Sequence, residues 1–332
     1  MDPLLFSTLV MLAVVLLFLM PSAAVAVYAE RRVSAFIQNR YGPNRVGPLG
    51  LFQPFADVIK LFLKEDIVPT QANRFLYTLA PMIPVSTAII TVAVIPFSEH
   101  VYITDLNVGV LFLLAVASLS VYGVTLAGWA SNSKYSLLGG LRAAAQMISY
   151  ELPMGVALAS VILFAGSLSV VDIVASQETW WNIFLNPIGF VIFTVAAFAE
   201  ANRAPFDLVE AEQELVGGFH TEYSSMKFGT FFLAEYMHVV IASMLITTFF
   251  FGGYHLPFAG YWLPEMGVVA KSILDIHVFL IKVVFWAFVF IWVRWTLPRF
   301  KFNQLMRLGW TKMLPLAILN FAVIAIILYY IG

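Results

Sequence analysis

Eight long apolar stretches constrain this chain more than any other feature of its sequence. They lie near residues 4–27, 75–96, 107–129, 147–168, 183–200, 229–251, 273–294 and 310–331. A helix needs about 20 mostly apolar residues to cross a bilayer, and such a helix satisfies its own backbone hydrogen bonds in hydrocarbon. Because 61% of the 332 residues are hydrophobic and only 11% are charged, we predict an all-α polytopic membrane protein with about eight transmembrane helices.

Composition excludes several classes of function. The 18 basic and 19 acidic residues nearly cancel, so the chain lacks the electrostatic signature of a nucleic-acid-binding protein. It has no cysteine, and therefore no thiolate to hold an iron-sulfur cluster or a structural zinc ion. Nucleophile elbows, phosphate-binding loops and nucleotide fingerprints are also missing from the sequence. Any redox centre is expected on another chain.

The basic residues predict the orientation in the membrane. All but two of them, Lys271 and Lys282, lie in the odd-numbered connections between the apolar stretches. Loops rich in Lys and Arg remain on the cytoplasmic side, so both termini are expected on the opposite side of a bacterial inner membrane or, alternatively, a mitochondrial inner membrane. The first stretch is expected to span rather than to be a signal peptide, because its only early charge is Asp2. We predict one membrane domain, 1–332, with functional loops at 28–74 and 201–228.

The loop at 28–74 contains an amphipathic segment after the turn-rich sequence YGPNRVGPLG. Phe52, Phe55, Ile59 and Phe62 recur at helical spacing, which predicts a helix lying along the membrane surface. One interpretation is a simple interfacial anchor. The other is a mouth through which a lipid-soluble molecule with a polar head leaves the bilayer. In that case four arginines are available to polarise the head group, namely Arg31, Arg32, Arg40 and Arg45.

The loop at 201–228 follows the fifth stretch and is unusually acidic. Six acids occur between Glu200 and Glu222 against a single Arg203. If the segment DLVEAEQEL is helical, Asp207, Glu210 and Glu214 share one face, and such crowding favours proton uptake by one of them. The loop is therefore predicted to exchange protons near neutral pH; the alternative is a solvated acidic face that docks a basic partner. A metal site is not expected, because the spacing fits no calcium-binding loop.

Ionisable residues also occur inside the apolar stretches, where they are costly and often functional. Glu151 is expected to open the fourth helix, Glu200 ends the fifth and Glu235 lies near the start of the sixth. Together they form a candidate carboxylate path from the acidic loop into the bilayer; the alternative is that each acid only hydrogen-bonds between helices. Lys282 is a candidate charge partner for one of these acids, and the histidines of these helices are expected to be packed or hydrogen-bonded.

Two segments carry a family resemblance. AERRVSAFIQNRYGPNRVGPLGLFQPFADVIKLFLKED and AEANRAPFDLVEAEQELVGGFHTEYSSMKFGTFFLAEY closely resemble the signature segments of the H subunit of proton-pumping NADH:quinone oxidoreductase, respiratory complex I. Its mitochondrial counterpart is NADH dehydrogenase subunit 1. The resemblance extends over essentially the whole chain and implies a subunit that joins the membrane arm to the peripheral arm and forms much of a quinone tunnel.

The resemblance also implies roles for individual residues, with no catalytic residue assigned to this chain. The tunnel and its entrance would be framed by Glu30, Arg31, Arg32, Arg45, Phe52, Phe55, Asp57 and Lys60. Proton relay and coupling would involve Asp207, Glu210, Glu212, Glu214, Glu222, Glu151, Glu200, Arg203 and Glu235.

The same resemblance implies substrates and partners. Quinone would be a substrate, with no covalently bound cofactor on this chain, and FMN and iron-sulfur clusters would sit on partner subunits. The partners would be the peripheral-arm iron-sulfur and quinone-site subunits, the small membrane subunits, the antiporter-like subunits and lipid. The alternatives are the membrane subunit of an energy-converting hydrogenase, a stand-alone proton or cation transporter, and a purely structural anchor.

Overall fold

The computed structural model describes residues 15–208, 212–257 and 267–331. Within these ranges the regular secondary structure is helical, apart from an isolated bridge between Ser98 and Val101, and the helices are joined by turns and irregular segments. Six helical segments are long and apolar enough to cross a membrane: 74–92, 109–130, 134–165, 225–250, 268–296 and 302–330. The shorter apolar helix Pro187–Glu200 falls in the fifth predicted stretch. The helix Met20–Ile37 overlaps the end of the first predicted stretch, 4–27, and continues into the segment predicted as a loop from residue 28. The predicted all-α polytopic class is confirmed.

The helices of the membrane body are α2 (Met20–Ile37), α4 (Arg74–Leu79), α5 (Met82–Val92), α6 (Gly109–Ala130), α7 (Lys134–Ala165), α10 (Pro187–Glu200), α12 (Ser225–Phe250), α14 (Val268–Thr296) and α16 (Leu314–Ile331). The shorter connecting helices are α3 (Gln53–Leu63), α8 (Val170–Ala175), α9 (Asn182–Leu185), α11 (Glu212–Leu215) and α15 (Phe302–Leu308). Single turns of other helix types are η1 (Val15–Leu19), η2 (Pro48–Gly50), η3 (Gly218–His220) and η4 (Gly309–Met313).

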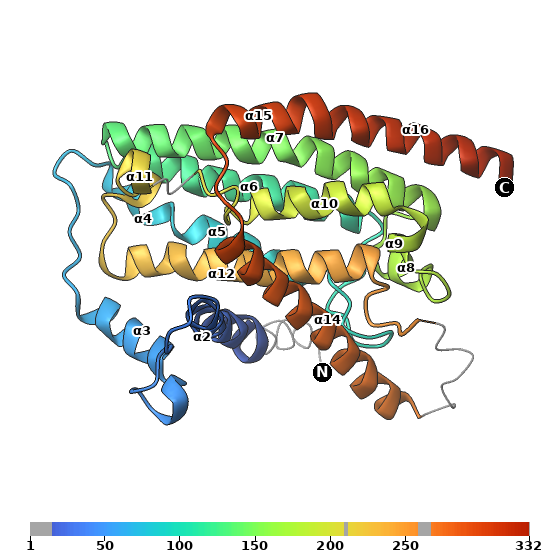
Figure 1. The fold of residues 1–332 in the computed structure, drawn as a ribbon, viewed down its shortest axis with the longest axis horizontal. Coiled ribbons are helices and arrows are strands. Elements are labelled where there is room, and N and C mark those ends of the chain that lie inside the picture. The colour runs from blue at the N-terminus through green and yellow to red at the C-terminus, as the bar shows by residue number, and fades with distance from the viewer. Residues whose placement is uncertain (1–14, 209–211, 258–266, 332) are drawn as a thin grey trace.

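Most long helices run side by side, as Figure 1 shows for α6, α7, α10 and α12, whereas α14 crosses the bundle diagonally. The two functional loops lie at the same end, because α3 and α11 are both found there, while α8 and α9 lie at the other end. This arrangement brings the 28–74 loop and the acidic loop to one face of the bundle.

Small residues bring some of these helices into backbone contact. Gly128 of α6 faces Gly140 and the carbonyl of Ser136 on α7, and a Cβ added at Gly128 would collide with that carbonyl. Close approach through small residues is how helices associate in lipid, where apolar burial gives little net drive. Aromatic packing adds to this between α10 and α14, where Phe198 and Phe290 stack with their ring centroids 3.9 Å apart.

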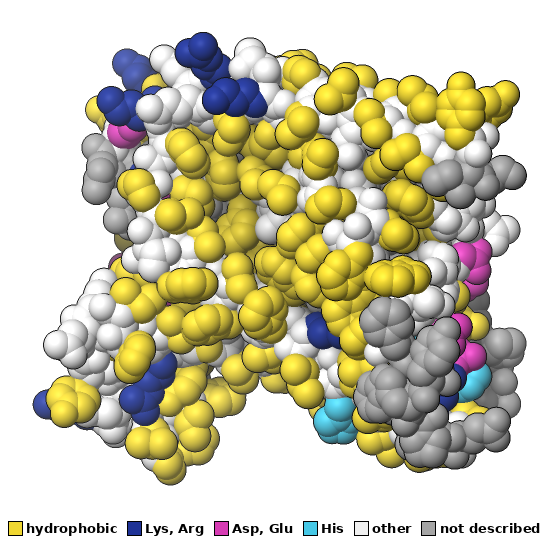
Figure 2. All heavy atoms as spheres, turned by 45° about the vertical axis from the view of Figure 1, so that its right-hand side comes forward, with side chains coloured by type: hydrophobic (Ala, Val, Ile, Leu, Met, Phe, Trp, Pro, Cys, Tyr) yellow, Lys and Arg dark blue, Asp and Glu magenta, His cyan; other side chains and the backbone are white. Residues whose placement is uncertain are grey.

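The outer surface is suited to lipid. Large apolar side chains of α14 and α16 are exposed, including Ile281, Val284 and Leu319. Figure 2 shows a largely apolar face with basic side chains gathered at its upper left edge and acidic ones at its right edge. Charged side chains at the two ends and apolar ones between them are the pattern expected for a chain that crosses a bilayer.

The fourth spanning helix differs from the prediction. Helix α7 begins at Lys134 rather than near residue 147, so Glu151 lies in its middle instead of opening it. The added segment contains Gly139, where a Cβ would lie 2.6 Å from the backbone nitrogen of Phe219. The helix therefore continues past the apolar stretch because it packs directly against the acidic loop.

Candidate functional site

A buried ion network lies where α2, α12 and α14 meet the start of the acidic loop. Arg203 donates from Nη1 to Glu30 Oε2 at 2.9 Å, and its Nε lies 2.8 Å from Glu235 Oε1 in an ion pair that falls short of hydrogen-bond geometry. Arg294 Nη1 donates to the other oxygen of Glu30 at 2.6 Å. The Arg203 guanidinium also lies over the Tyr236 ring, 4.2 Å from its centroid. Side chains that are far apart in the sequence thus form one cluster with two cations and two carboxylates.

Arg203 is the centre of this network and is only 2% exposed. Burial disfavours its charge, but the carboxylates of Glu235 and Glu30 outweigh burial and hold the pKa of Arg203 above its usual range. The guanidinium therefore stays charged, and its two carboxylate partners remain paired in the absence of a further charge. A small cavity of about 10 Å³ adjoins the network and is also lined by Arg294 and Phe290.

The residues predicted at the tunnel entrance divide into two groups. Glu30 lies on α2 and belongs to the buried ion network, whereas Arg31 of the same helix points to α3 and pairs with Asp57 at 2.7 Å. Lys60 lies 3.8 Å from the other oxygen of Asp57. Three of the predicted entrance residues, Arg31, Asp57 and Lys60, therefore lie together. Glu30 instead faces the buried ion network.

The turn-rich segment is held to α2 by Arg32. Its side chain donates to the carbonyl of Leu49 at 2.8 Å and to the hydroxyl of Tyr28 at 3.0 Å, and that hydroxyl donates to the same carbonyl. Arg45 lies farther along the loop and is exposed. An apolar groove of about 360 Å³ adjoins Arg32 between α2 and α14 and is lined by Phe36, Phe288 and Trp292.

Helix α3 presents its apolar side chains outward. Phe52, Phe55, Ile59 and Phe62 are all more than half exposed. The predicted surface helix is therefore present with its predicted apolar face uncovered, as a helix resting on lipid requires. The opposite side of α3 contacts both α2 and α12.

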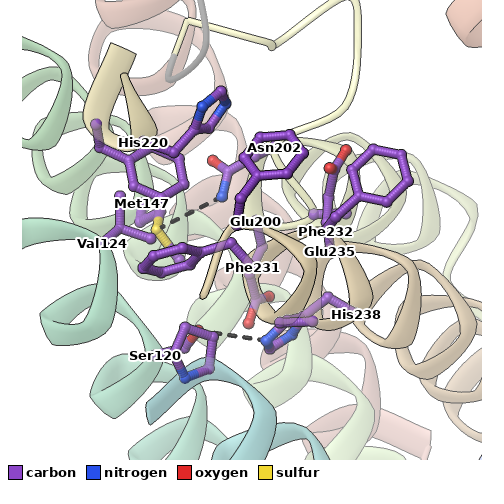
Figure 3. Close-up of a pocket in the computed structure, with 15 residues that line it drawn as sticks. Ser120, Val124, Met147, Glu200, Asn202, His220, Phe231, Phe232, Glu235 and His238 are labelled. Atoms are coloured by element: carbon purple, nitrogen blue, oxygen red, sulfur yellow. Dashed lines mark hydrogen bonds between the residues drawn. The ribbon is translucent and has the colours of Figure 1, made fainter. Parts of the chain in front are cut away.

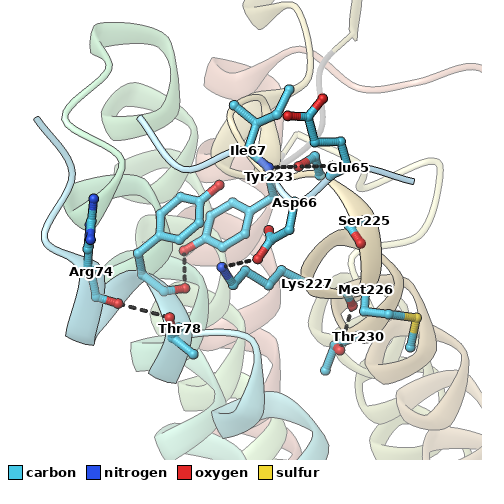
Figure 4. A network of polar contacts seen from close by, with 12 residues as sticks. Glu65, Asp66, Ile67, Arg74, Thr78, Tyr223, Ser225, Met226, Lys227 and Thr230 are labelled. Carbon is cyan, nitrogen blue, oxygen red and sulfur yellow. Dashed lines mark hydrogen bonds and ion pairs between the residues drawn. The ribbon is translucent and has the colours of Figure 1, made fainter. Parts of the chain in front are cut away.

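A polar clamp fixes the end of α3 to the beginning of α12 (Figure 4). Lys227 Nζ pairs with Asp66 at 2.8 Å, and the backbone nitrogen of Ile67 donates to Ser224 Oγ at 2.9 Å. Ser225 Oγ donates to the carbonyl of Leu61 at 3.0 Å. These contacts join the C-terminal part of the first loop to the C-terminal end of the acidic loop.

The acidic loop is fixed to the bundle by an aromatic pair. Tyr77 and Tyr223 stack at 4.1 Å with nearly parallel rings. Tyr77 donates its hydroxyl to the carbonyl of Glu222 at 2.6 Å, and Tyr223 donates to the carbonyl of Tyr77 at 3.1 Å. Burial and the neighbouring Tyr77 raise the pKa of Tyr223 above its usual range, so this hydroxyl keeps its proton. Glu222 is therefore held in place through its backbone.

The shared acidic face was conditional on a helix over the segment DLVEAEQEL, and the described residues at its start, Asp207 and Leu208, are not helical. Asp207 precedes the short helix α11, because Phe206 and Leu208 are buried in the core and pull this part of the chain into turns. Glu214 of α11 pairs with Arg142 of α7 at 2.6 Å. Glu212 begins α11, and Glu210 lies outside the described residues.

A cavity of about 50 Å³ with several polar side chains in a mainly apolar wall begins beneath the acidic loop and reaches into the bundle. Figure 3 shows His220 toward one end and Ser120 and His238 toward the other, with Glu200 between them. Glu235 also lines the cavity, which therefore adjoins the buried ion network. A water needs roughly 10–15 Å³ and two to four polar partners, so this cavity has room and hydrogen-bonding groups for water.

Glu151 extends this line of acids. Ser118 donates to Glu151 Oε1 at 2.7 Å, and Glu151 is close enough to Glu200 for the two carboxylates to interact electrostatically. Of the three intramembrane acids predicted to form a path, Glu235 and Glu200 line one cavity and Glu151 lies near Glu200; that they conduct protons stays a prediction. Water-filled cavities and carboxylates in series are the components that proton transfer requires.

Two important residues have surroundings that the sequence did not predict. Arg294 was expected only as one of the basic residues of the last odd-numbered loop, but it lies within α14 and binds Glu30. Lys282 was a candidate partner for a carboxylate, but it donates instead to the carbonyls of residues 251, 253 and 255 at 2.8, 2.9 and 2.6 Å. Among the described residues it forms no ion pair. Lys282 of α14 thus caps the end of α12, and no sequence pattern indicates such a contact between two distant helices.

In the described ranges, no cluster of three or more His, Cys, Asp or Glu side chains is arranged to hold a metal ion. Glu30 and Glu235 pair with arginine, Glu151 accepts a hydrogen bond from a serine hydroxyl, and Glu200 lines the cavity.

Comparison with known proteins identifies the family. A family model described as NADH dehydrogenase matches residues 10–325. The chain is 60% identical over 314 residues to NADH-quinone oxidoreductase subunit 8 of Rhodothermus marinus, covering 92% of both chains. It is 59% identical to the NADH-quinone oxidoreductase H subunit of Salinibacter ruber, covering 92% of this chain and 91% of the relative. It is 50% identical to the H subunit numbered 1 of Cytophaga hutchinsonii, covering 90% of each. The chain therefore belongs to the NADH dehydrogenase family, as a membrane subunit of the H type of NADH-quinone oxidoreductase.

Proposed function

We propose that this chain forms much of the quinone tunnel of its complex, anchors the peripheral arm and couples quinone reduction to proton translocation. The observation that carries the proposal is the continuity from the acidic loop into the bundle, where the Glu30–Arg203–Glu235 network adjoins a water-sized cavity containing Glu200. In this account residues 1–332 act as one membrane domain, with 28–74 as the entrance loop and 201–228 as the coupling loop.

The entrance is proposed to lie beside α3. This helix has an exposed apolar face and packs on both α2 and α12, so an isoprenoid tail has a lipid-facing route between these elements. Arg31 and Lys60 place positive charge next to Asp57 on α3, where a carbonyl-bearing head group would pass. A structure with quinone or an inhibitor bound should place the tail between α2, α12 and α3.

Reduction of the quinone supplies the charge that drives coupling. Two electrons arriving from a partner's iron-sulfur chain put negative charge on a head group held beneath the acidic loop, and that charge repels nearby carboxylates. Proton uptake by Asp207, Glu210 or Glu214, or rearrangement of their ion pairs, relieves the repulsion. The pairing of Glu214 with Arg142 is one contact that a new negative charge would weaken.

The response then passes inward along the carboxylates. Glu222 is held at the end of the loop and Glu235 faces both the ion network and the cavity. Protons moving through water in this cavity reach Glu200 and then Glu151, from which antiporter-like subunits of the same complex would receive the signal. The peripheral-arm subunits would dock on the odd-numbered loops.

The experiment that tests this proposal replaces loop acids in the assembled complex. The double variant Glu210→Gln with Glu214→Gln should assemble but lose most proton pumping per quinone reduced. Glu178→Gln, in a loop at the opposite end of the bundle, is the matched control and should pump normally. Normal pumping by the assembled double variant would defeat the coupling role. Loss of assembly without any change in residual turnover would instead favour a docking role for the loop.

A further inference from the structure

His238 lies between two cavities in the bundle. The cavity beneath the acidic loop, about 50 Å³, and a deeper one of about 20 Å³ share three lining residues, Glu200, Ala201 and His238. The deeper cavity is otherwise lined by apolar side chains of α10 and α12, such as Ile241 and Leu245. By volume each has room for at least one water. The side chains of Glu200 and His238 therefore form the ionisable part of the wall that separates the two.

We propose that His238 is a proton-carrying residue that passes protons between these two cavities. The inference rests on the proposed coupling function and names a residue for it that no pattern in the sequence singles out. A proton enters the imidazole from water in the outer cavity, and a proton leaves the ring to water in the inner cavity. These two transfers leave the ring in its other neutral tautomer, and a turn of the imidazole with exchange of its hydrogen-bond partners restores the starting tautomer before the next proton.

The contacts of the ring suit this role. His238 Nε2 lies 3.3 Å from Ser120 Oγ on α6, and the ring also hydrogen-bonds the backbone of Pro84 on α5. A hydroxyl can both donate and accept, so Ser120 remains a partner whether Nε2 is protonated or not. The contact with Pro84 orients the ring.

The groups facing His238 come from several elements. Glu200 on α10 is the acid that shares both cavities with it, Glu235 lies on α12 itself, and His220 comes from the acidic loop. Because it lines both cavities, Glu200 can exchange protons with the same water as the ring. The remaining wall of the outer cavity is mostly apolar, including Met147 and Phe231, so a proton crossing this region has few other side chains to use.

The competing explanation is that His238 only links α12 to α6 through Ser120. Two variants separate the explanations in the complete complex reconstituted into proteoliposomes. His238→Gln keeps a side chain able to hydrogen-bond Ser120 but unable to carry a proton. His238→Ala opens space for a small azole added to the medium. His277→Gln on α14, whose ring is exposed and contacts its own helix, is the matched histidine control.

The readouts are NADH-driven quinone reduction and proton uptake into the vesicles. His238→Gln should lower coupled turnover at least about tenfold, because a positioned proton-transfer group contributes roughly 10²–10⁴-fold. His277→Gln should behave as the unmodified protein. Imidazole should restore coupled turnover in His238→Ala, whereas pyrazole, similar in shape but a far weaker base, should not.

Each contrary result has a distinct meaning. Normal pumping by assembled His238→Gln overturns the inference, and so does equal restoration by imidazole and pyrazole, because only a packing role accepts either ring. If His238→Ala fails to assemble, the assembled His238→Gln decides alone. The proposed coupling function fails separately if Glu200→Gln and Glu235→Gln both pump normally. If Glu200→Gln pumps poorly and His238→Gln pumps normally, the role of the histidine is contradicted and the coupling function is not.

Discussion

At the scale of single residues, Arg203 is a buried cation whose charge depends on two carboxylate partners. Replacing it with Gln would leave Glu235 and Glu30 buried beside each other with less positive charge, and removing one partner of a buried pair costs about 3–5 kcal/mol. We expect Arg203→Gln to lower the thermal midpoint of the purified complex and its yield. Arg31→Gln removes a half-exposed pair, whose loss costs only about 0–1 kcal/mol, and is the control.

One outcome for the thermal midpoints of these variants would contradict the prediction for Arg203. If Arg203→Gln and Arg31→Gln have the same thermal midpoint in the assembled complex, the buried ion network does not stabilise this region. Arg203→Lys should fall between the two, because it keeps the charge but lacks the planar fork that reaches two carboxylates.

His255 gives a pH dependence at the end of α12. Burial, with Lys282 and Lys271 nearby, lowers the pKa of His255 to about 4. An unfolded chain has an ordinary histidine pKa near 6.5, so between these values the unfolded state binds the proton and the folded state does not. The free energy of unfolding therefore falls as the pH drops from about 6.5 toward 4, by up to about 3 kcal/mol. His255→Asn should remove this part of the acid sensitivity.

Thermal inactivation of the solubilised complex across this pH range measures the effect. The difference between the unmodified protein and His255→Asn is the quantity of interest, because acids elsewhere in the complex contribute equally to both. Parallel pH profiles for the two proteins would contradict the assigned burial of His255.

The position of a single residue could be predicted where the spacing of its sequence neighbours fixes the helix that carries it. Asp57 and Lys60 were predicted on the surface helix and are found on α3. The partners of Glu30 were not predicted, because Arg203 and Arg294 lie far along the chain and meet Glu30 only through helix packing. Lys282 shows the same limit, since its carbonyl partners belong to a turn after another helix.

At the scale of elements, the contact between α7 and the acidic loop is the most sensitive to a single methyl group. At Gly139 a Cβ would lie 2.6 Å from the backbone nitrogen of Phe219, so Gly139→Ala must push η3 away from α7. We expect this variant to reduce coupled turnover or assembly. At Gly155 of the same helix the nearest atom is 3.9 Å away, so Gly155→Ala should be tolerated.

The glycine pair controls for helix propensity, because both substitutions favour helix by about 1 kcal/mol. Hydrogen exchange of the amides at residues 216–222 should increase in Gly139→Ala alone. Unchanged exchange and unchanged turnover would show that the loop does not rest on α7.

Element prediction followed hydropathy closely and lost accuracy where packing decides. The helix α3 was predicted from its spacing of phenylalanines and is present. The start of α7 was placed too late, because its first turns are held by contact with the loop rather than by lipid. Whether a helix begins at Asp207 was left open by the sequence, because hydropathy does not reveal that Phe206 and Leu208 are buried in the core.

At the scale of the whole molecule, the orientation is a prediction that the absence of cysteine makes easy to test. Single cysteines introduced at Lys134 and Lys301 should react with a membrane-impermeant maleimide only from the cytoplasmic side. Cysteines at Glu99 and Glu178 should react only from the other side, since the basic odd-numbered loops remain cytoplasmic. Labelling of Lys134→Cys and Glu99→Cys from the same side would contradict the predicted topology.

The central claim is that acids within the bundle change their protonation when the bound quinone is reduced. Infrared difference spectra of the intact complex, recorded on quinone reduction, report protonated carboxyl groups directly. The account predicts carboxyl bands that appear or shift on reduction, and that are diminished by Glu200→Gln and Glu235→Gln but not by Glu178→Gln. Spectra from both variants that are identical to those of the unmodified complex would contradict the claim.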